Sequence, residues 1–100
     1  MTLKINQSGE QIVATLAGRL DTAASTQFAA DMQPLIDNAD KAITLDCSAM
    51  EFISSSGLRL LLTLRKATIA QGGNVTITGV NDNVKQVFAI TGFYSLFNFA

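Results

Sequence analysis

A leucine-rich segment in the second half of the chain constrains the fold more than any other feature of the sequence. Its apolar residues recur at helical spacing and predict one helix face, formed by Leu58, Leu61, Leu62 and Ile69 and widened by Leu60, Leu64 and Ala67. The narrow polar face that remains consists of Arg59, Thr63 and Lys66. A helix with so wide an apolar surface is mostly buried, so other elements must cover it.

Five short runs are typical of β-strands, and they lie at residues 3–6, 12–16, 42–46, 74–78 and 96–99. The turn residues between the first two runs predict a hairpin that opens the fold. The third run is bounded by charged residues and predicts a central strand, whereas the last run predicts a short edge strand.

Three helices are predicted between these strands. The first begins at Asp21 or Thr22, because both side chains can accept hydrogen bonds from the first turn. Pro34 lies inside it and predicts a kink or a new turn, since proline has no backbone donor. The leucine-rich helix stops at residues 72–73, and residues 81–83 cap a short third helix. This order predicts an α/β fold with a mixed sheet and helices packed on it.

The composition fits one folded domain over residues 1–100 and excludes several classes of function. Hydrophobic residues make up 48% of the chain and charged residues 15%, which favours a folded core. The net charge of -1 provides no basic field for nucleic acid or anionic lipid. Histidine is absent, so the commonest general base and zinc ligand are missing. We therefore expect no enzymatic activity, no metal and no cofactor.

The first residues and the cysteine content predict a cytoplasmic protein. Residues 1–5 alternate polar and apolar side chains and lack the features of a signal peptide. The longest apolar stretch is Leu60 to Leu62, with Leu58 and Leu64 around it. Arg59 and Thr63 interrupt it, and it is far shorter than the ~20 residues that span a bilayer, so no membrane insertion is expected. Cys47 is the only cysteine, which excludes an internal disulfide and suits a reducing compartment.

Few other side chains suggest chemistry. Cys47 has no histidine base and is interpreted as a small buried residue at a strand end. Asp46 and Glu51 flank one predicted loop and could meet, but this spacing is interpreted as ordinary loop polarity. No glycine run has the spacing of a phosphate-binding loop.

A serine triplet, Ser54-Ser55-Ser56, directly precedes Gly57 and the leucine-rich helix and follows a predicted loop over residues 46–53. One interpretation is capping, in which a serine accepts a hydrogen bond from the first helical turn. The other is phosphorylation, which adds about -1.5 to -2 charges. A helix N-terminus tolerates such an anion, whereas a docked partner would lose packing and meet unpaired charge. Phosphorylation here would block an association and leave the fold standing.

Two segments resemble the landmarks of STAS-domain proteins, specifically the anti-sigma factor antagonists. In “LDCSAMEFISSSGLRLLLTLRK”, a strand ends in Asp and a polar residue, a loop follows, and Ser-Ser-Gly begins a leucine-rich helix. “LAGRLDTAAS” is similar to the family's Gly-x-Leu-Asp turn into the first helix, and “GGNVTITGVNDNVKQVFAITGF” extends the match over nearly all of the chain. The resemblance implies the STAS (SpoIIAA-like) fold, an α/β fold with a mixed four- to five-stranded sheet and helices packed on one side.

The resemblance also implies a function. Similar proteins bind an anti-sigma factor that is also a serine kinase, with a histidine-kinase-like ATPase fold, and thereby release a sigma factor. Phosphorylation of one serine abolishes this binding, and a metal-dependent serine phosphatase restores it.

On this chain the resemblance implies that Ser55 is the phosphate acceptor and that Ser56 is its neighbour. It also implies that Gly57 permits a tight helix start. Asp21 matches the acid of the Gly-x-Leu-Asp turn. The family usually carries Asp where this chain has Ser54, which leaves Ser54 and Ser56 as alternative acceptors. Phe52 and Ile53 are either core anchors or exposed contacts. The expected partner-binding residues are Asp21, Phe52, Ile53, Ser54, Ser55, Ser56 and Gly57.

A second function remains open from the sequence. The chain is alternatively a STAS subunit of an ABC-type membrane (lipid) transport complex, docked without phosphorylation. The missing Asp at Ser54 favours this alternative, whereas the serines and the Gly-x-Leu-Asp turn favour the antagonist.

Overall fold

The computed structural model describes residues 1–100 and contains a five-stranded sheet whose strands lie in chain order. The strands are β1 (Thr2–Ser8), β2 (Gln11–Leu20), β3 (Ala42–Ile53), β4 (Asn74–Thr78) and β5 (Asn98–Phe99). β1 pairs antiparallel with β2, and every other neighbouring pair is parallel. The sheet is therefore mixed, with β3 at its centre and β5 at an edge, as the sequence predicts.

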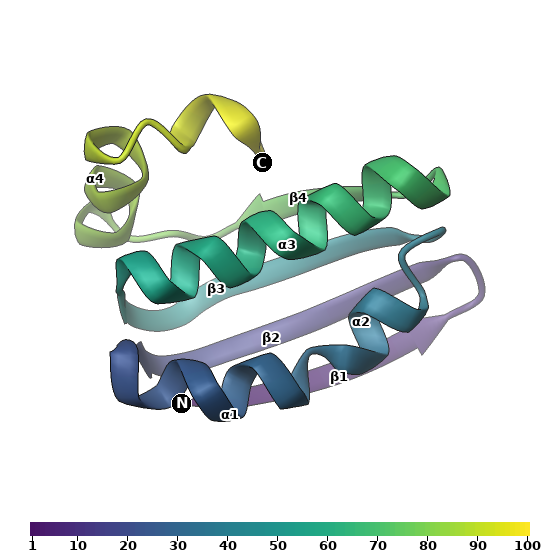
Figure 1. Cartoon of the computed structure of the whole chain (residues 1–100), viewed down its shortest axis with the longest axis horizontal. Coiled ribbons are helices and arrows are strands. Elements are labelled where there is room, and N and C mark those ends of the chain that lie inside the picture. Colours follow the sequence, from purple (N-terminus) through teal and green to yellow (C-terminus); the bar gives the residue numbers. More distant parts are fainter.

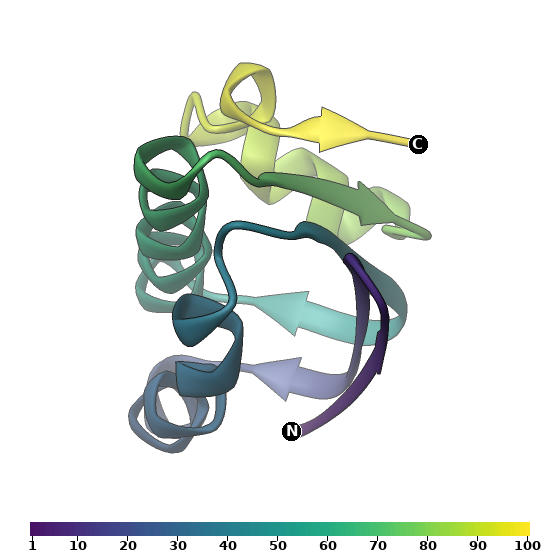
Figure 2. The ribbon, with the colours of Figure 1, turned by 90° about the vertical axis from the view of Figure 1, so that its right-hand side faces the viewer.

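Four helices and one 3-10 turn accompany the sheet. They are α1 (Thr22–Asp31), α2 (Gln33–Asp37), α3 (Ser55–Gln71), α4 (Asp82–Ile90) and the 3-10 turn η1 (Tyr94–Leu96). α1, α2 and α3 cover one face of the sheet (Figure 2). α4 lies across the end of the sheet at which α3 begins (Figure 1). None of these helices combines the length and the apolar character that a membrane crossing requires.

The opening hairpin is confirmed, and both of its strands are longer than predicted. Ser8 pairs with Gln11 across a two-residue turn, in which Gly9 has a φ of 62°. Ile12, Ala14 and Leu16 are buried at every second position of β2. This period places them on the face that the helices cover.

Pro34 separates two helices on the same face of the sheet. α1 ends at Asp31 and α2 begins at Gln33, with Pro34 in the first turn of α2. A proline costs little there, because the first amides of a helix have no partner within the helix. The predicted new turn is confirmed as a new short helix.

The loop predicted over residues 46–53 is wrong, because β3 continues through this segment to Ile53. Against β2, the register of β3 shifts twice, between Thr15 and Ala17 and between Gly18 and Arg19. Each shift gives β3 one extra residue, as in a β-bulge. The bulges break the period of two, so the segment resembles a loop in the sequence although it remains paired.

The predicted apolar face of the leucine-rich helix is correct in part. The buried residues of α3 are Gly57, Leu58, Leu61, Leu64 and Thr68. Leu60 and Leu62 are half-buried, and Ile69 is 62% exposed. α3 lies on a single sheet face, and no second layer of the chain covers its outer side, so the buried stripe is narrower than the leucine pattern predicts (Figure 2).

Aromatic packing holds the end of the chain against α4. Asn81 caps α4 by accepting a hydrogen bond from the Val84 amide over 2.8 Å. The Phe88 ring meets Phe97 and Phe99 edge to face, with centroids 5.5 and 5.4 Å apart. These contacts anchor β5, which pairs with β4 through only two residues.

Candidate functional site

Two helices begin side by side at one end of the parallel sheet. Leu20 of β2 is in register with Ile53 of β3, and the Ser54 amide donates to the Leu20 carbonyl oxygen over 2.8 Å. α1 and α3 start directly after these two positions. Asp21 and the serine triplet lie more than thirty residues apart in the sequence, but they cap or begin α1 and α3, which start at the same end of the sheet (Figure 1).

The three serines have three different environments. The Ser54 hydroxyl caps α3 by accepting a hydrogen bond from the Gly57 amide over 3.1 Å. Ser55 is the first residue of α3, is exposed, and makes no side-chain hydrogen bond. Ser56 is half-buried. Capping therefore accounts for Ser54 alone and leaves the Ser55 hydroxyl free.

Asp21 caps the neighbouring helix. Its carboxylate accepts a hydrogen bond from the Ala24 amide over 2.8 Å, and its carbonyl oxygen accepts one from the Ser25 hydroxyl over 2.9 Å. The sequence left Asp21 and Thr22 as alternative caps, and the structure shows that Asp21 is the N-cap. Asp21 thus orients the start of α1 beside the serines.

Gly57 allows α3 to approach the sheet closely. A Cβ atom at this position would lie 2.7 Å from Leu20 Cγ and 3.0 Å from Ile53 Cγ1, which is closer than carbon atoms pack. Both Gly57 and Ile53 are buried. These two residues therefore support the helix start from beneath and present no side-chain surface to a partner.

Phe52 lies next to Ile53 but differs in its surroundings. Its side chain is half-buried, and the Arg19 guanidinium lies 4.6 Å from the centre of its ring. Arg19 and Phe52 are register partners on β2 and β3. Of the two alternatives left open by the sequence, Ile53 is a core anchor, whereas Phe52 is a partly exposed side chain covered by a cation.

A shallow depression of about 400 Å³ separates the first turns of α1 and α3. Its lining residues are Thr22, Ser25 and Thr26 from α1, with Ser56, Arg59 and Leu60 from α3. Arg59 is the only charged side chain among them and is exposed. The depression thus places hydroxyl groups and one cation around Ser56, the residue that follows Ser55.

The other candidate groups have structural partners. The Asp46 carboxylate accepts hydrogen bonds from the Ser48 hydroxyl over 2.7 Å and the Ser48 amide over 3.0 Å, and these bonds lower its pKa. Glu51 lies exposed on β3. Burial raises the pKa of Cys47 to about 12, and the nearby Asp46 charge adds to this effect. No three histidine, cysteine or acidic side chains gather where they could hold a metal ion.

Cys47 is expected to resist alkylation in the folded protein. Its thiol is buried and stays protonated at about pH 8, and only the thiolate is an effective nucleophile. Mass spectrometry after iodoacetamide treatment should find no adduct on the native chain and complete labelling in denaturant. An Ala49→Cys chain that also carries Cys47→Ala places a thiol at an exposed position of the same strand and should label readily. Equal labelling rates for the two native proteins would contradict the prediction.

Residues 2–100 match the family model of the STAS domain. The chain belongs to the STAS domain family. The mixed five-stranded sheet with its helices is thus the STAS fold that the sequence resemblance implies.

Known proteins similar to this STAS chain include anti-sigma factor antagonists and a member of the sulfate transporter family. BtrV of Bordetella bronchiseptica, named as a candidate anti-sigma factor antagonist, is 29% identical over 97 residues, which cover 97% of this chain and 84% of BtrV. The anti-sigma factor antagonist SpoIIAA, a Bacillus cell fate determinant, is 23% identical. Its unphosphorylated form has a TM-score of 0.79, covering 99% of this chain and 88% of SpoIIAA, and its phosphorylated form has a TM-score of 0.72, covering 99% and 91%. A sulfate transporter family protein of Wolinella succinogenes has a TM-score of 0.70 at 16% identity, covering 84% of this chain and 68% of that protein.

Sequence reasoning assigned most of this end of the STAS chain but omitted the residues around the depression. It placed Arg59 on a polar helix face without relating it to Ser55, although a spacing of four residues puts the two on the same side of a helix. Thr22, Ser25 and Thr26 carry no comparable signal. Their position beside α3 follows from the β2–β3 register, which pairs residues far apart in the sequence.

Proposed function

We propose that this STAS chain is an anti-sigma factor antagonist whose partner binding is switched off by phosphorylation of Ser55. Its partner is an anti-sigma factor serine kinase, and binding releases a sigma factor in the cytoplasm. The observation that carries the proposal is the state of Ser55, the first residue of α3, which is exposed and whose hydroxyl makes no hydrogen bond. The similarity to BtrV and to SpoIIAA, which has been solved with and without phosphate, supports it.

The surroundings of the triplet favour Ser55 over its neighbours as the acceptor. The Ser54 oxygen already accepts from the Gly57 amide over 3.1 Å, so it would have to leave the helix cap to attack ATP freely. Ser56 is half-buried in the depression between α1 and α3, where a kinase has less access. Ser55 alone offers an exposed hydroxyl without a structural role.

The reaction requires little chemistry from this chain. The Ser55 oxygen attacks the γ-phosphorus of ATP, the bond from that phosphorus to the β-phosphate oxygen breaks, ADP leaves, and the hydroxyl proton passes to a base of the kinase. The product carries about -1.5 to -2 charges on a surface that previously had none at this position. A metal-dependent serine phosphatase then transfers the phosphoryl group to water and restores the hydroxyl. The chain contributes a rigid helix start and one accessible oxygen.

Incubation with a candidate anti-sigma factor kinase and ATP is expected to place one phosphate on Ser55. Tandem mass spectrometry of the digested protein locates the modified residue. The Ser55→Ala chain should remain unmodified and should still bind the kinase. Absence of phosphate from the whole triplet would refute the switch, and phosphate on Ser54 or Ser56 in the unaltered chain would refute the assignment to Ser55.

One observation favours a second candidate function. Ser54 occupies the position at which anti-sigma factor antagonists usually carry Asp, so the surface offered to a kinase lacks that negative charge. The chain would then be a STAS subunit of an ABC-type membrane (lipid) transport complex that binds without phosphorylation. Affinity purification from the native host distinguishes the two functions, because a transporter ATPase would co-purify in one case and a serine kinase in the other.

A further inference from the structure

We infer that Arg59 is the internal counter-ion for a phosphate on Ser55, so that α3 itself binds the modification. The inference rests on the proposed function in one respect, namely that Ser55 is the residue that receives the phosphate. It adds a role for a residue on the outer face of α3. The ligand is a phosphate monoester, and the group that recognises it is a guanidinium of the same helix.

Ser55 and Arg59 are placed to meet across one helical turn. They are four residues apart in α3, so their Cβ atoms are neighbours at about 5–6 Å. Both residues are exposed, and the buried side of the helix is formed by others, including Gly57, Leu58 and Leu61. The anion would lie on the N-terminal side of the cation, which is the more favourable order in a helix.

Arg59 forms no ion pair with another group of the chain. The only ion pairs in the structure are those of Lys41 with Glu10 and Asp40, at the opposite end of the sheet. α3 contains no acidic residue, and Arg59 is the only charged side chain in the depression. On the neighbouring helix, the Asp21 carboxylate already accepts from the Ala24 amide. The Arg59 guanidinium is therefore available to a new anion beside it.

A guanidinium suits a phosphate particularly well. Its planar array of donors can form two parallel hydrogen bonds to phosphate oxygens. Phosphorylation would then change two features of the surface together, because it adds a dianion and withdraws the Arg59 cation from any partner. An aspartate at position 55 carries a single charge that Arg59 can neutralise, so it should imitate the phosphate only in part.

The test measures the second pKa of a phosphoserine that is incorporated at position 55 during synthesis of the full chain. This pKa is about 6 for an unperturbed phosphoserine, and a neighbouring cation lowers it. Phosphorus NMR at a series of pH values should show that Arg59→Gln raises the pKa by about 0.2 to 0.4 units. Arg65→Gln is the matched control, because Arg65 lines a different depression, near Ser95 and Leu96. The difference should shrink in about 0.5 M salt, which screens exposed charges.

Two results would overturn the inference. One is an unchanged phosphoserine pKa in the Arg59→Gln chain. The other is an equal shift in the Arg65→Gln chain, which would indicate the general field of the helix rather than a specific pair. Asp21 is present in the unaltered, Arg59→Gln and Arg65→Gln chains, so any effect of its charge on the phosphoserine pKa is the same in all three. Because synthesis places the phosphate, failure of a kinase to modify Ser55 would refute the proposed function without affecting this measurement.

Discussion

Replacing Gly73 by alanine is expected to lower the free energy of unfolding by about 3 kcal/mol or more, at the upper end of what overpacking costs. A Cβ atom at this position would overlap the carbonyl oxygens of Ala39 and Lys41. Both oxygens belong to the backbone, so no side-chain rotation relieves the overlap. The alanine can be accommodated only if the segment before β3 moves away from the start of β4.

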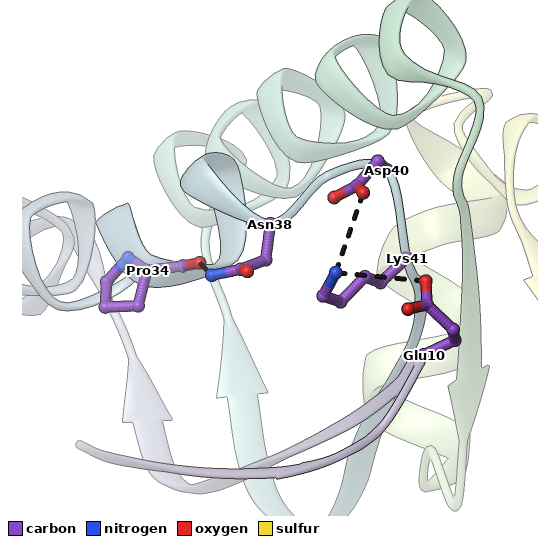
Figure 3. A network of polar contacts seen from close by, with 5 residues as sticks. All are labelled: Glu10, Pro34, Asn38, Asp40 and Lys41. Atoms are coloured by element: carbon purple, nitrogen blue, oxygen red, sulfur yellow. Dashed lines mark hydrogen bonds and ion pairs between the residues drawn. The ribbon is translucent and has the colours of Figure 1, made fainter.

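That segment is held from several directions. The Lys41 carbonyl oxygen accepts from the Asn74 amide over 3.3 Å, and the Lys41 amide donates to the Asn38 carbonyl oxygen over 3.1 Å. The side chains add further links (Figure 3), because Lys41 Nζ lies 3.8 Å from Glu10 and 3.6 Å from Asp40, and the Asn38 side-chain amide donates to the Pro34 carbonyl oxygen over 2.8 Å. Moving the segment would disturb these contacts together.

Gly72→Ala is the matched control for this experiment. A Cβ at Gly72 meets no atom within 4 Å, but its φ of 87° makes any other residue cost about 1–2 kcal/mol. Urea unfolding of the two variants separates backbone overlap from left-handed strain. A Gly73→Ala chain as stable as the Gly72→Ala chain would contradict the prediction.

Phosphorylation of Ser55 is expected to weaken binding to the anti-sigma factor kinase by about a hundredfold or more, since unfavourable charge placed in an interface costs several kcal/mol. The Ser55→Asp chain should lose less affinity, about tenfold, because Arg59 lies one turn away from a single negative charge. Both chains should unfold within about 0.5 kcal/mol of the unmodified protein, because position 55 is exposed. Titration calorimetry measures the affinities, and urea unfolding measures the stabilities.

Ser95→Asp provides the control for this second prediction. Ser95 is exposed in η1, beside the depression that Arg65 and Ile69 of α3 line. The substitution makes the same chemical change away from the serine triplet and should leave the affinity unchanged. Equal losses for Ser55→Asp and Ser95→Asp would show that net charge, rather than the helix start, controls binding.

The local features of the fold were predictable from short stretches of sequence. Asp21 and Asn81 precede their helices as side chains that accept from the first turn, and both act as N-caps. Pro34 separates α1 from α2 because proline has no backbone N–H to donate within a helix, and this property does not depend on distant residues. Errors arose where distant residues decide the outcome. β3 continues to Ile53 because β2 supplies its hydrogen bonds across two bulges, and Ile69 is exposed because no layer lies outside α3.

The sequence by itself determined that a helix follows the serine triplet, and it gave capping as one of two interpretations of these hydroxyls, because capping depends on residues three positions apart. Only the tertiary structure decided which hydroxyl remains free. The pairing of Leu20 with Ile53 places α1 beside α3. As a result, Ser56 lines the depression between the two helices, whereas Ser55 is exposed one turn from Arg59. The exposure of each serine and the residues around it depend on the pairing of β2 with β3, which joins residues more than thirty positions apart, and no local sequence pattern encodes that pairing.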